Sequence, residues 1–421
     1  MSNMPPSILL LILLATSLLV AAESPSKPVA LPFGPRSTPS VNVPRPTLMP
    51  YEAVQNILSK DKGHAHTQEV DGTTPGLPDD INSLKVDHNE RGLMEERAAS
   101  MKDEGTLGMS LNRRQTGTTC VGSWANDTYI STLFYYGGTG YTVSLCPGAQ
   151  IPMDNAAFFY WPNQTLTTQG NPTDATRAQL YIRNTNISCL VYGGLDNTHY
   201  TKIQNIILDG GRPALGQLFN VPATISIGGN NIGQTVQNVK VFEPRGWNGS
   251  IVIFGAPGSR VASNQIIART RQALGGINMV DYNPFGGSYA GVTVTANTIT
   301  SDTQFIKVGI AIGTLSWGTD NRTIARPSGG TVSNNILQSG LTGYFGYGIS
   351  ISGMNLTTVT GNKATKAKFG GTYTSSCFQS IAPLPPFQAF VQDKYTTPTC
   401  KIDNNFVKTN NVVFPICIGP K

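Results

Sequence analysis

Histidine, glutamate and metal-binding cysteine patterns are scarce beyond residue 114 of this 421-residue chain. His199 and Glu243 are the sole histidine and glutamate there, and no carboxylate pattern surrounds His199. The sequence has no C-x-x-C pair and no Cys/His spacing of a zinc site. Adjacent acidic residues are also missing from this region, so the paired carboxylates of a glycoside hydrolase are not evident.

The sequence has one long apolar run, at residues 8–20, which is followed by Ala21 and Ala22. This layout predicts a signal peptide over residues 1–22, because the run is short for a membrane helix of about 20 residues. An uncleaved N-terminal anchor is the alternative. No later stretch reaches that length, so we expect no membrane anchor and an extracellular location, with association to a cell wall as one form of it.

Residues 23–114 lack β-branched runs and are rich in Pro, Ser and charged residues. Such a segment buries too little apolar surface to offset its ordering entropy, which predicts a disordered leader. It ends at Arg113-Arg114, a dibasic pair typical of propeptide processing, although an arm that stays attached is an alternative. We expect residues 115–421 to form one domain, with N-terminal coils and a cap at 118–200, repeats at 201–376 and a C-terminal cap at 377–421.

Acidic residues are in the minority within residues 115–421. This part carries 19 Lys and Arg against 11 Asp and Glu, a net charge of +8. A basic secreted surface suits an anionic polysaccharide, although it also serves solubility. We expect a polysaccharide partner, no nucleic acid, and a monomer.

All cysteines and all N-x-Ser/Thr sequons lie beyond the dibasic pair. An even number of cysteines in an oxidising compartment predicts disulfides that tie the caps, with the pairing left open. The sequons predict a glycosylated exterior. The cysteines are Cys120, Cys146, Cys189, Cys377, Cys400 and Cys417, and the sequon asparagines are Asn126, Asn163, Asn186, Asn248, Asn321 and Asn355.

The chain does contain a repeated phrase with two halves. One half is an alternating apolar pair beside glycine: ATISIGG (223–229), GSIVIFG (249–255), GGINMVD (275–281), VGIAIG (308–313) and YGISISG (347–353). The other places a valine or isoleucine three residues before an asparagine in its clear copies: VASNQI (261–266), VTANTI (294–299), VSNNIL (332–337), VTGNKA (359–364) and IDNNFV (402–407), with weaker copies at 203–208 and 236–241.

Alternation with period two predicts strands with one buried face. Repeats of about 20 to 50 residues predict a solenoid in which each coil buries the apolar face of its neighbour. With at least two short strands in each repeat, the fold class is all-β and the architecture a parallel β-helix. We expect the asparagines at 205, 238, 264, 297, 335, 362 and 405 to occupy tight bends in the αL conformation and to bond the same amide one coil away.

Several phrases resemble secreted fungal right-handed parallel β-helix proteins of the pectin-lyase-like superfamily. They are LCPGA (145–149), TQGNPTDATRAQL (168–180), NIILDGGRPALG (205–216), IVIFGAPGS (251–259), GGINMVDYNPFGG (275–287) and IKVGIAIG (306–313). The resemblance implies a right-handed β-helix, a carbohydrate-active ancestry and a ligand along the long outer face. The N-T-D, D-D, G-H-G and R-I-K motifs of polygalacturonases are absent, which disfavours a pectin hydrolase.

The resemblance also implies that eliminative cleavage of a uronic-acid polymer is one candidate activity. Lyases of this superfamily commonly use a Lys or Arg base with carboxylate-bound calcium. The catalytic candidates are Lys307, Asp281 and Arg245, and Asp281 and Asp320 would bind calcium if the protein is a lyase. The alternatives are that Asp281 caps a turn and that Lys307 is a solvated charge at a strand edge.

Aromatic and small residues suggest a sugar-binding shelf. Ser226, Asn278, Ala311 and Ser350 are predicted to face outward between the repeated apolar pairs, beside aromatic residues that could stack on sugar rings. The binding candidates are Trp247, Asn278, Tyr282, Trp317 and Asp320. A non-catalytic carbohydrate-binding or structural solenoid is the competing function.

Overall fold

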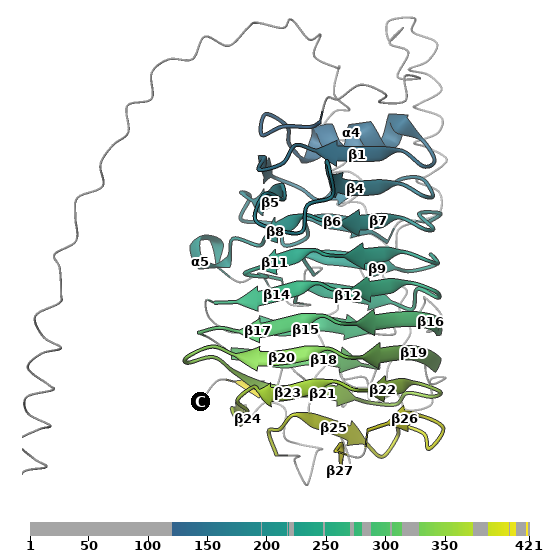
Figure 1. Ribbon diagram of the computed structural model, residues 1–421, viewed down its shortest axis with the longest axis vertical. Coiled ribbons are helices and arrows are strands. Elements are labelled where there is room, and N and C mark those ends of the chain that lie inside the picture. Colours follow the sequence, from purple (N-terminus) through teal and green to yellow (C-terminus); the bar gives the residue numbers. More distant parts are fainter. Residues whose placement is uncertain are drawn as a thin grey trace, which may run out of the picture. The chain divides into compact units, whose positions relative to one another are not determined.

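Parallel strands dominate the computed structural model (Figure 1). It describes residues 120–194, 196–216, 218, 223–246, 249–269, 273–279, 288–303, 305–313, 328–373, 386–403, 405–409 and 418–419. The predicted signal peptide, leader and dibasic site lie outside these residues. Three parallel sheets built from many short strands fit the expected parallel β-helix.

Sheet A has nine parallel strands. In spatial order they are β1 (Thr142–Leu145), β4 (Thr165–Thr168), β7 (Lys202–Gln204), β10 (Thr235–Gln237), β13 (Arg260–Ala262), β16 (Ser288–Thr295), β19 (Ser328–Ser333), β22 (Thr358–Thr360) and β26 (Lys401–Ile402).

Sheet B has eight strands. They are β2 (Gln150–Met153), β5 (Gln179–Ile182), β8 (Ile207–Asp209), β11 (Lys240–Phe242), β14 (Gln265–Ala268), β17 (Thr298–Ser301), β20 (Ile336–Ser339) and β23 (Lys363–Lys366).

Sheet C has nine strands. They are β3 (Ala157–Phe158), β6 (Val191–Gly193), β9 (Ile225–Gly228), β12 (Ile251–Phe254), β15 (Ala273–Met279), β18 (Phe305–Ile312), β21 (Tyr344–Ile351), β25 (Phe390–Asp393) and β27 (Val407–Thr409). A separate antiparallel pair joins β24 (Thr372–Tyr373) to β28 (Ile418–Gly419).

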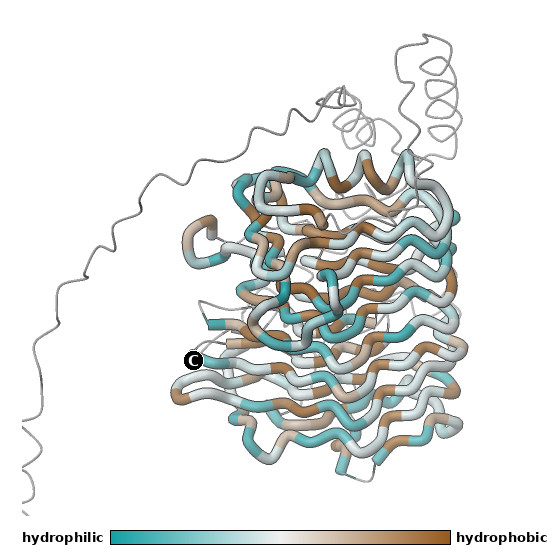
Figure 2. Tube along the Cα trace, turned by 45° about the horizontal axis from the view of Figure 1, so that its top comes forward, coloured by the Kyte–Doolittle hydropathy of each residue, from teal (hydrophilic) through white to brown (hydrophobic). Residues whose placement is uncertain are grey.

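From β1 to β25 the coils visit sheets A, B and C in turn, so the repeat contains three strands rather than the two that its sequence halves made visible. The repeated apolar pairs stack as predicted. Ile225 is paired with Ile251, Ile251 with Ile277, Ile277 with Ile310 and Ile310 with Ile349, and all are buried. The valines of the second half stack in sheet A, at Val236, Val261, Val294, Val332 and Val359. Figure 2 shows hydrophobic segments recurring from coil to coil.

The asparagine prediction is correct in part. Asn264, Asn297, Asn335 and Asn362 form a buried ladder at the corner between sheets A and B, with successive side-chain amides 2.9 Å apart. Asn205 and Asn238 are aligned with Ser263 instead, one residue before the ladder, and have φ values of 53° and 54°. The αL bend and the amide ladder therefore occupy two adjacent positions, because one side chain points into the corner while the residue before it makes the bend.

The first coil is covered by α4 (Asp127–Gly137) (Figure 1). Asn126 caps this helix, since its side-chain oxygen accepts a hydrogen bond from the Tyr129 amide at 2.9 Å. Ile130 and Phe134 lie on the buried face of the helix, and the Phe134 ring lies 4.7 Å from that of Phe159. The helix thus shields apolar side chains at the open end of the solenoid.

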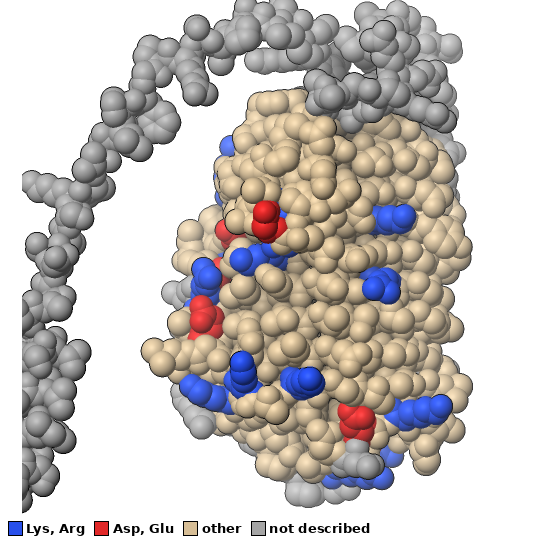
Figure 3. Space-filling view, viewed as in Figure 1, with Lys and Arg blue, Asp and Glu red and all other residues tan. Residues whose placement is uncertain are grey.

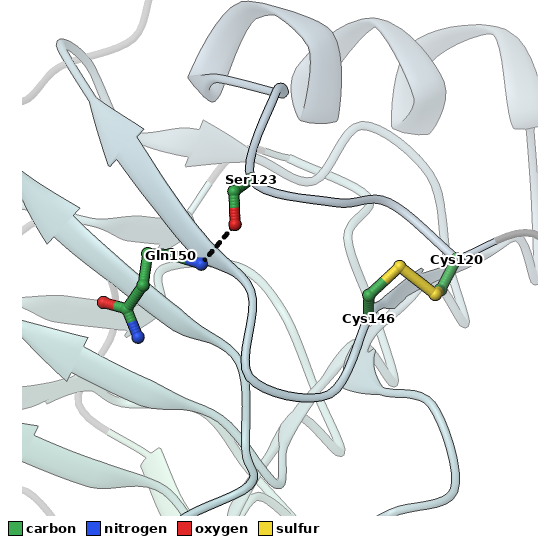
Figure 4. The surroundings of a disulfide bond; sticks show 4 residues. All are labelled: Cys120, Ser123, Cys146 and Gln150. Atoms are coloured by element: carbon green, nitrogen blue, oxygen red, sulfur yellow. Dashed lines mark hydrogen bonds between the residues drawn. A yellow bond between two sulfur atoms is a disulfide. The ribbon is translucent and has the colours of Figure 1, made fainter. Parts of the chain in front are cut away.

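A disulfide joins Cys120 to Cys146, which connects the segment before α4 to the corner between β1 and β2 (Figure 4). Beside it the Ser123 hydroxyl accepts a hydrogen bond from the Gln150 amide at 2.8 Å. The expectation that every cysteine is paired is wrong for Cys189 and Cys400, which are free thiols. Cys189 packs as a small apolar residue beside Phe158, and burial raises the pKa of its thiol to about 12.

Candidate functional site

The candidate site lies at the corner where each coil passes from sheet B to sheet C. Three chain segments bring basic residues there: α5 (Arg212–Leu215) between β8 and β9, the connection between β11 and β12 with Arg245, and the start of β18 with Lys307. The short helix α5 projects from the side of the stack in Figure 1. All three basic residues are buried, with 2%, 1% and 7% of their surface exposed.

Arg245 holds the backbone of this corner in place. Its guanidinium donates to the carbonyl oxygens of Leu215 and Gly216 at 2.8 and 3.1 Å, at the C-terminal end of α5. It also donates to the carbonyls of Asn184 and Ile187 at 3.1 and 3.0 Å, in the connection between β5 and β6, two coils before its own. These four contacts engage the guanidinium of this predicted catalytic residue with backbone carbonyl oxygens on both sides of the corner.

Arg212 occupies the first turn of α5. Gly211 precedes it with a φ of 63°, which allows the chain to turn sharply into the helix. The Arg212 guanidinium donates to the Pro244 carbonyl at 3.3 Å. This contact joins α5 to the connection that carries Arg245.

Lys307 lies in β18 between Ile306, which faces the core, and the buried Val308. Burial, and secondly the positive charge of Arg212, lower the pKa of Lys307 to about 8. Both effects disfavour the protonated amine. With this pKa about one-tenth of the lysine is the neutral amine at pH 7 and about half at pH 8, and that form can act as a general base.

Carboxylates at the same corner are occupied by backbone and side-chain contacts. Glu243 accepts a hydrogen bond from the Arg269 amide at 3.1 Å, and the Arg269 guanidinium lies 3.3 Å from Asp302. Asp209 accepts from the Gly211 amide at 2.9 Å. Within the part of the chain that the structure describes, no three His, Cys, Asp or Glu side chains gather as a metal site.

The predicted shelf is a real row but is not open to solvent. Ser226, Asn278, Ala311 and Ser350 lie in one register on sheet C, with Val252 between the first two. All four are buried, at 0–1% exposure. Asn278 lies against its own strand, because a Cβ on Gly275 would be 2.6 Å from its side-chain oxygen. Small side chains predicted the alignment, but exposure depends on what packs over the sheet.

The other predicted site residues, Asp281, Tyr282, Trp247, Trp317 and Asp320, lie outside the described residues. The same holds for Cys377, Cys417, Asn248 and Asn321. Among the remaining sequons, Asn163 and Asn186 are exposed, whereas Asn126 and Asn355 are half-buried.

Sequence reasoning did not select Arg212, the residue that helps to lower the pKa of Lys307. The phrase NIILDGGRPALG contains it, and the Gly-Gly-Arg-Pro order is a visible signal for a sharp turn into a short helix. Its proximity to Lys307, 95 positions later, follows only from the stacking of coils.

No family model, curated protein or solved structure matches this chain. Among the residues the structure describes, no helix has the length and apolar character needed to cross a membrane.

Proposed function

We propose that this chain is a secreted, right-handed parallel β-helix protein that acts on an anionic extracellular polysaccharide by lyase-type elimination. The observation that carries the proposal is Lys307, a buried lysine whose pKa is lowered to about 8 beside Arg212. The net charge of residues 115–421 favours a polyanionic partner. The Cys120–Cys146 disulfide supports an oxidising, extracellular compartment.

In the proposed reaction the neutral Lys307 amine removes the proton at C5 of a uronate unit. The electron pair left on C5 forms the C4–C5 double bond, the glycosidic oxygen leaves from C4, and water supplies its proton. Arg212 acts through Lys307, because its positive charge helps to keep the pKa of the amine low and so makes the neutral base available. Arg245 positions α5, and with it Arg212, through its four carbonyl contacts.

The test incubates the purified protein with polygalacturonate, alginate and neutral glucans, and follows the ultraviolet absorbance of unsaturated uronates with and without a chelator. We expect product from one uronate polymer, and a loss of about 100-fold or more in rate for Lys307→Ala. Lys307→Arg keeps the charge but cannot act as a base near neutral pH, so it should be equally inactive. Lys240→Ala, on the outer face of sheet B, is the matched control and should retain activity.

Glycan binding without any unsaturated product would contradict the elimination and favour the competing function, a non-catalytic binding or structural solenoid. A rate that falls with chelator would assign calcium a part in the reaction.

A further inference from the structure

A second surface feature lies at the corner between sheets C and A. This corner is on the side of sheet A away from the asparagine ladder. Two residues before the aligned segment of sheet A, the chain adopts the left-handed conformation, and Gly233, Gly258 and Gly291 have φ values of 65°, 70° and 70°. Tyr200 occupies the same position before β7, with a φ of 61°, as do Asn163 before β4 at 61° and Leu356 before β22 at 52°. A bulky aromatic residue rarely adopts this conformation, which costs about 1–2 kcal/mol.

A buried hydrogen-bond network holds Tyr200 in this conformation. The Tyr200 amide donates to the Ile232 carbonyl at 2.8 Å. The Gln234 side chain is fully buried, and its amide donates to the Gly193 carbonyl at 2.6 Å, the Thr198 carbonyl at 3.0 Å and the Thr201 hydroxyl at 3.0 Å. Strained residues persist where the surrounding structure fixes them, and such positions are common at binding sites.

The ring that is held in this way is open to solvent. Tyr200 is 46% exposed and lies against Gly233, where a Cβ would be 2.3 Å from a ring carbon. On the next two coils, a Cβ on Gly258 or Gly291 would meet only glycine backbone, at 3.4 Å or more. The aromatic ring therefore stands at one end of an open track along these glycines.

Positive charge lines the same face. Lys202 and Arg260 are exposed and lie on β7 and β13, with Thr235 of β10 between them in register, so their Cα atoms are about 9–10 Å apart. The nine described strands of sheet A contain no aspartate or glutamate. Figure 3 likewise shows basic and no acidic side chains over the upper and middle coils of sheet A in that view. The carboxylate of the adjoining turn, Asp196, accepts a hydrogen bond from Asn230 at 3.2 Å.

We propose that Tyr200, Lys202 and Arg260, with the glycine track, form a binding surface for a linear anionic polysaccharide that runs across the coils. One sugar ring stacks on Tyr200, and carboxylates further along the polysaccharide pair with Lys202 and Arg260. This inference rests on the substrate class of the proposed function but not on its chemistry, because Lys307 lies at a different corner of the coil.

The experiment measures the affinity of the full chain for polygalacturonate oligomers by calorimetry at several salt concentrations, with a neutral dextran oligomer for comparison. Tyr200→Gly is the key variant, since glycine already occupies this position on the next three coils and relieves the backbone strain. We expect its melting temperature to be maintained and its affinity to fall about five- to tenfold, through loss of ring stacking. Lys202→Ala/Arg260→Ala should weaken binding about tenfold or more and reduce its salt dependence.

The matched control is Lys363→Ala/Lys366→Ala, which removes two exposed lysines from β23 at the edge of sheet B. Full affinity in Tyr200→Gly, an equal loss in the control pair, or no binding of polygalacturonate to the full chain would overturn the inference. Binding that depends on Tyr200 in a protein without lyase activity would support the surface and reject only the elimination. If Lys307→Ala abolishes cleavage while Tyr200→Gly leaves the affinity unchanged, the result would instead support the elimination and reject the surface.

Discussion

The side-chain nitrogen of Asn297 donates to the side-chain oxygen of Asn335 at 2.9 Å, one coil away, and also to the Val261 carbonyl at 3.0 Å. The Asn297 oxygen in turn accepts from the backbone and side chain of Asn264. Each amide of the ladder thus satisfies polar groups of two neighbouring coils in a corner closed to water. This relationship explains why the repeat retains asparagine at a buried position.

Replacing Asn297 should therefore destabilise the fold strongly. Asn297→Ala leaves the Val261 carbonyl, the Asn335 oxygen and the Asn264 amide without these partners, and we expect a loss of about 2–4 kcal/mol in the free energy of unfolding. Urea denaturation followed by circular dichroism measures this loss. Thr295→Ala, half-buried on the preceding strand, is the control and should change stability by less than about 1 kcal/mol. Similar losses in both variants would argue against a special contribution from the ladder.

At the bend before the ladder, in contrast, we expect a substitution to stabilise the protein. Ala296 is exposed with a φ of 54°, at the position where Gly361 is found two coils later. Ala296→Gly should stabilise the protein by about 0.5–1 kcal/mol, because relief of the left-handed strain exceeds the entropy cost of glycine. Ala262→Gly, in the regular strand β13, should destabilise it. A lower melting temperature in both variants would refute the argument from φ.

The Cys120–Cys146 disulfide closes a loop with a sequence separation of 26. Cys146→Ser should lower the free energy of unfolding by about 3 kcal/mol, since the unfolded chain gains freedom. The free, half-buried Cys400 offers the control, and Cys400→Ser should have little effect. Thiol labelling of the native protein checks the assignment: Cys400 should react without reductant, whereas labelling of Cys120 before reduction would contradict the bond.

Lys307 should make stability depend on pH. Its folded-state pKa of about 8 lies below the ordinary value of about 10.4. The unfolded chain therefore binds more protons between these values, and the stability contributed by this group rises with pH across that window. Lys307→Met should raise the free energy of unfolding at pH 7 by about 3 kcal/mol. This difference between the variant and the original protein should become smaller toward a pH of about 10. A stability difference that stays constant across this range would show that the lysine is not perturbed.

Apolar spacing was sufficient to predict the stacking of Ile251 on Ile277 and of Val261 on Val294, since these residues recur at matching places in each copy of the repeat. The strands of sheet B were not separated from those of sheet A, because elements such as Lys240–Phe242 are only three residues long and follow the asparagine corner within the same repeated phrase. The asparagine alignment failed by one position at Asn205 and Asn238, because both the bend and the ladder favour asparagine for different physical reasons.

Sequence by itself determined the repeating architecture, because each coil must cover the apolar face of the next and the same apolar pattern therefore recurs in every coil. It also marked Lys307 as a residue of interest. Tertiary structure decided what surrounds such residues: the burial of Asn278, the four carbonyls around Arg245, and the approach of Arg212 to Lys307. These depend on contacts between coils far apart in the chain, and a local pattern contains no information on distances across the stack.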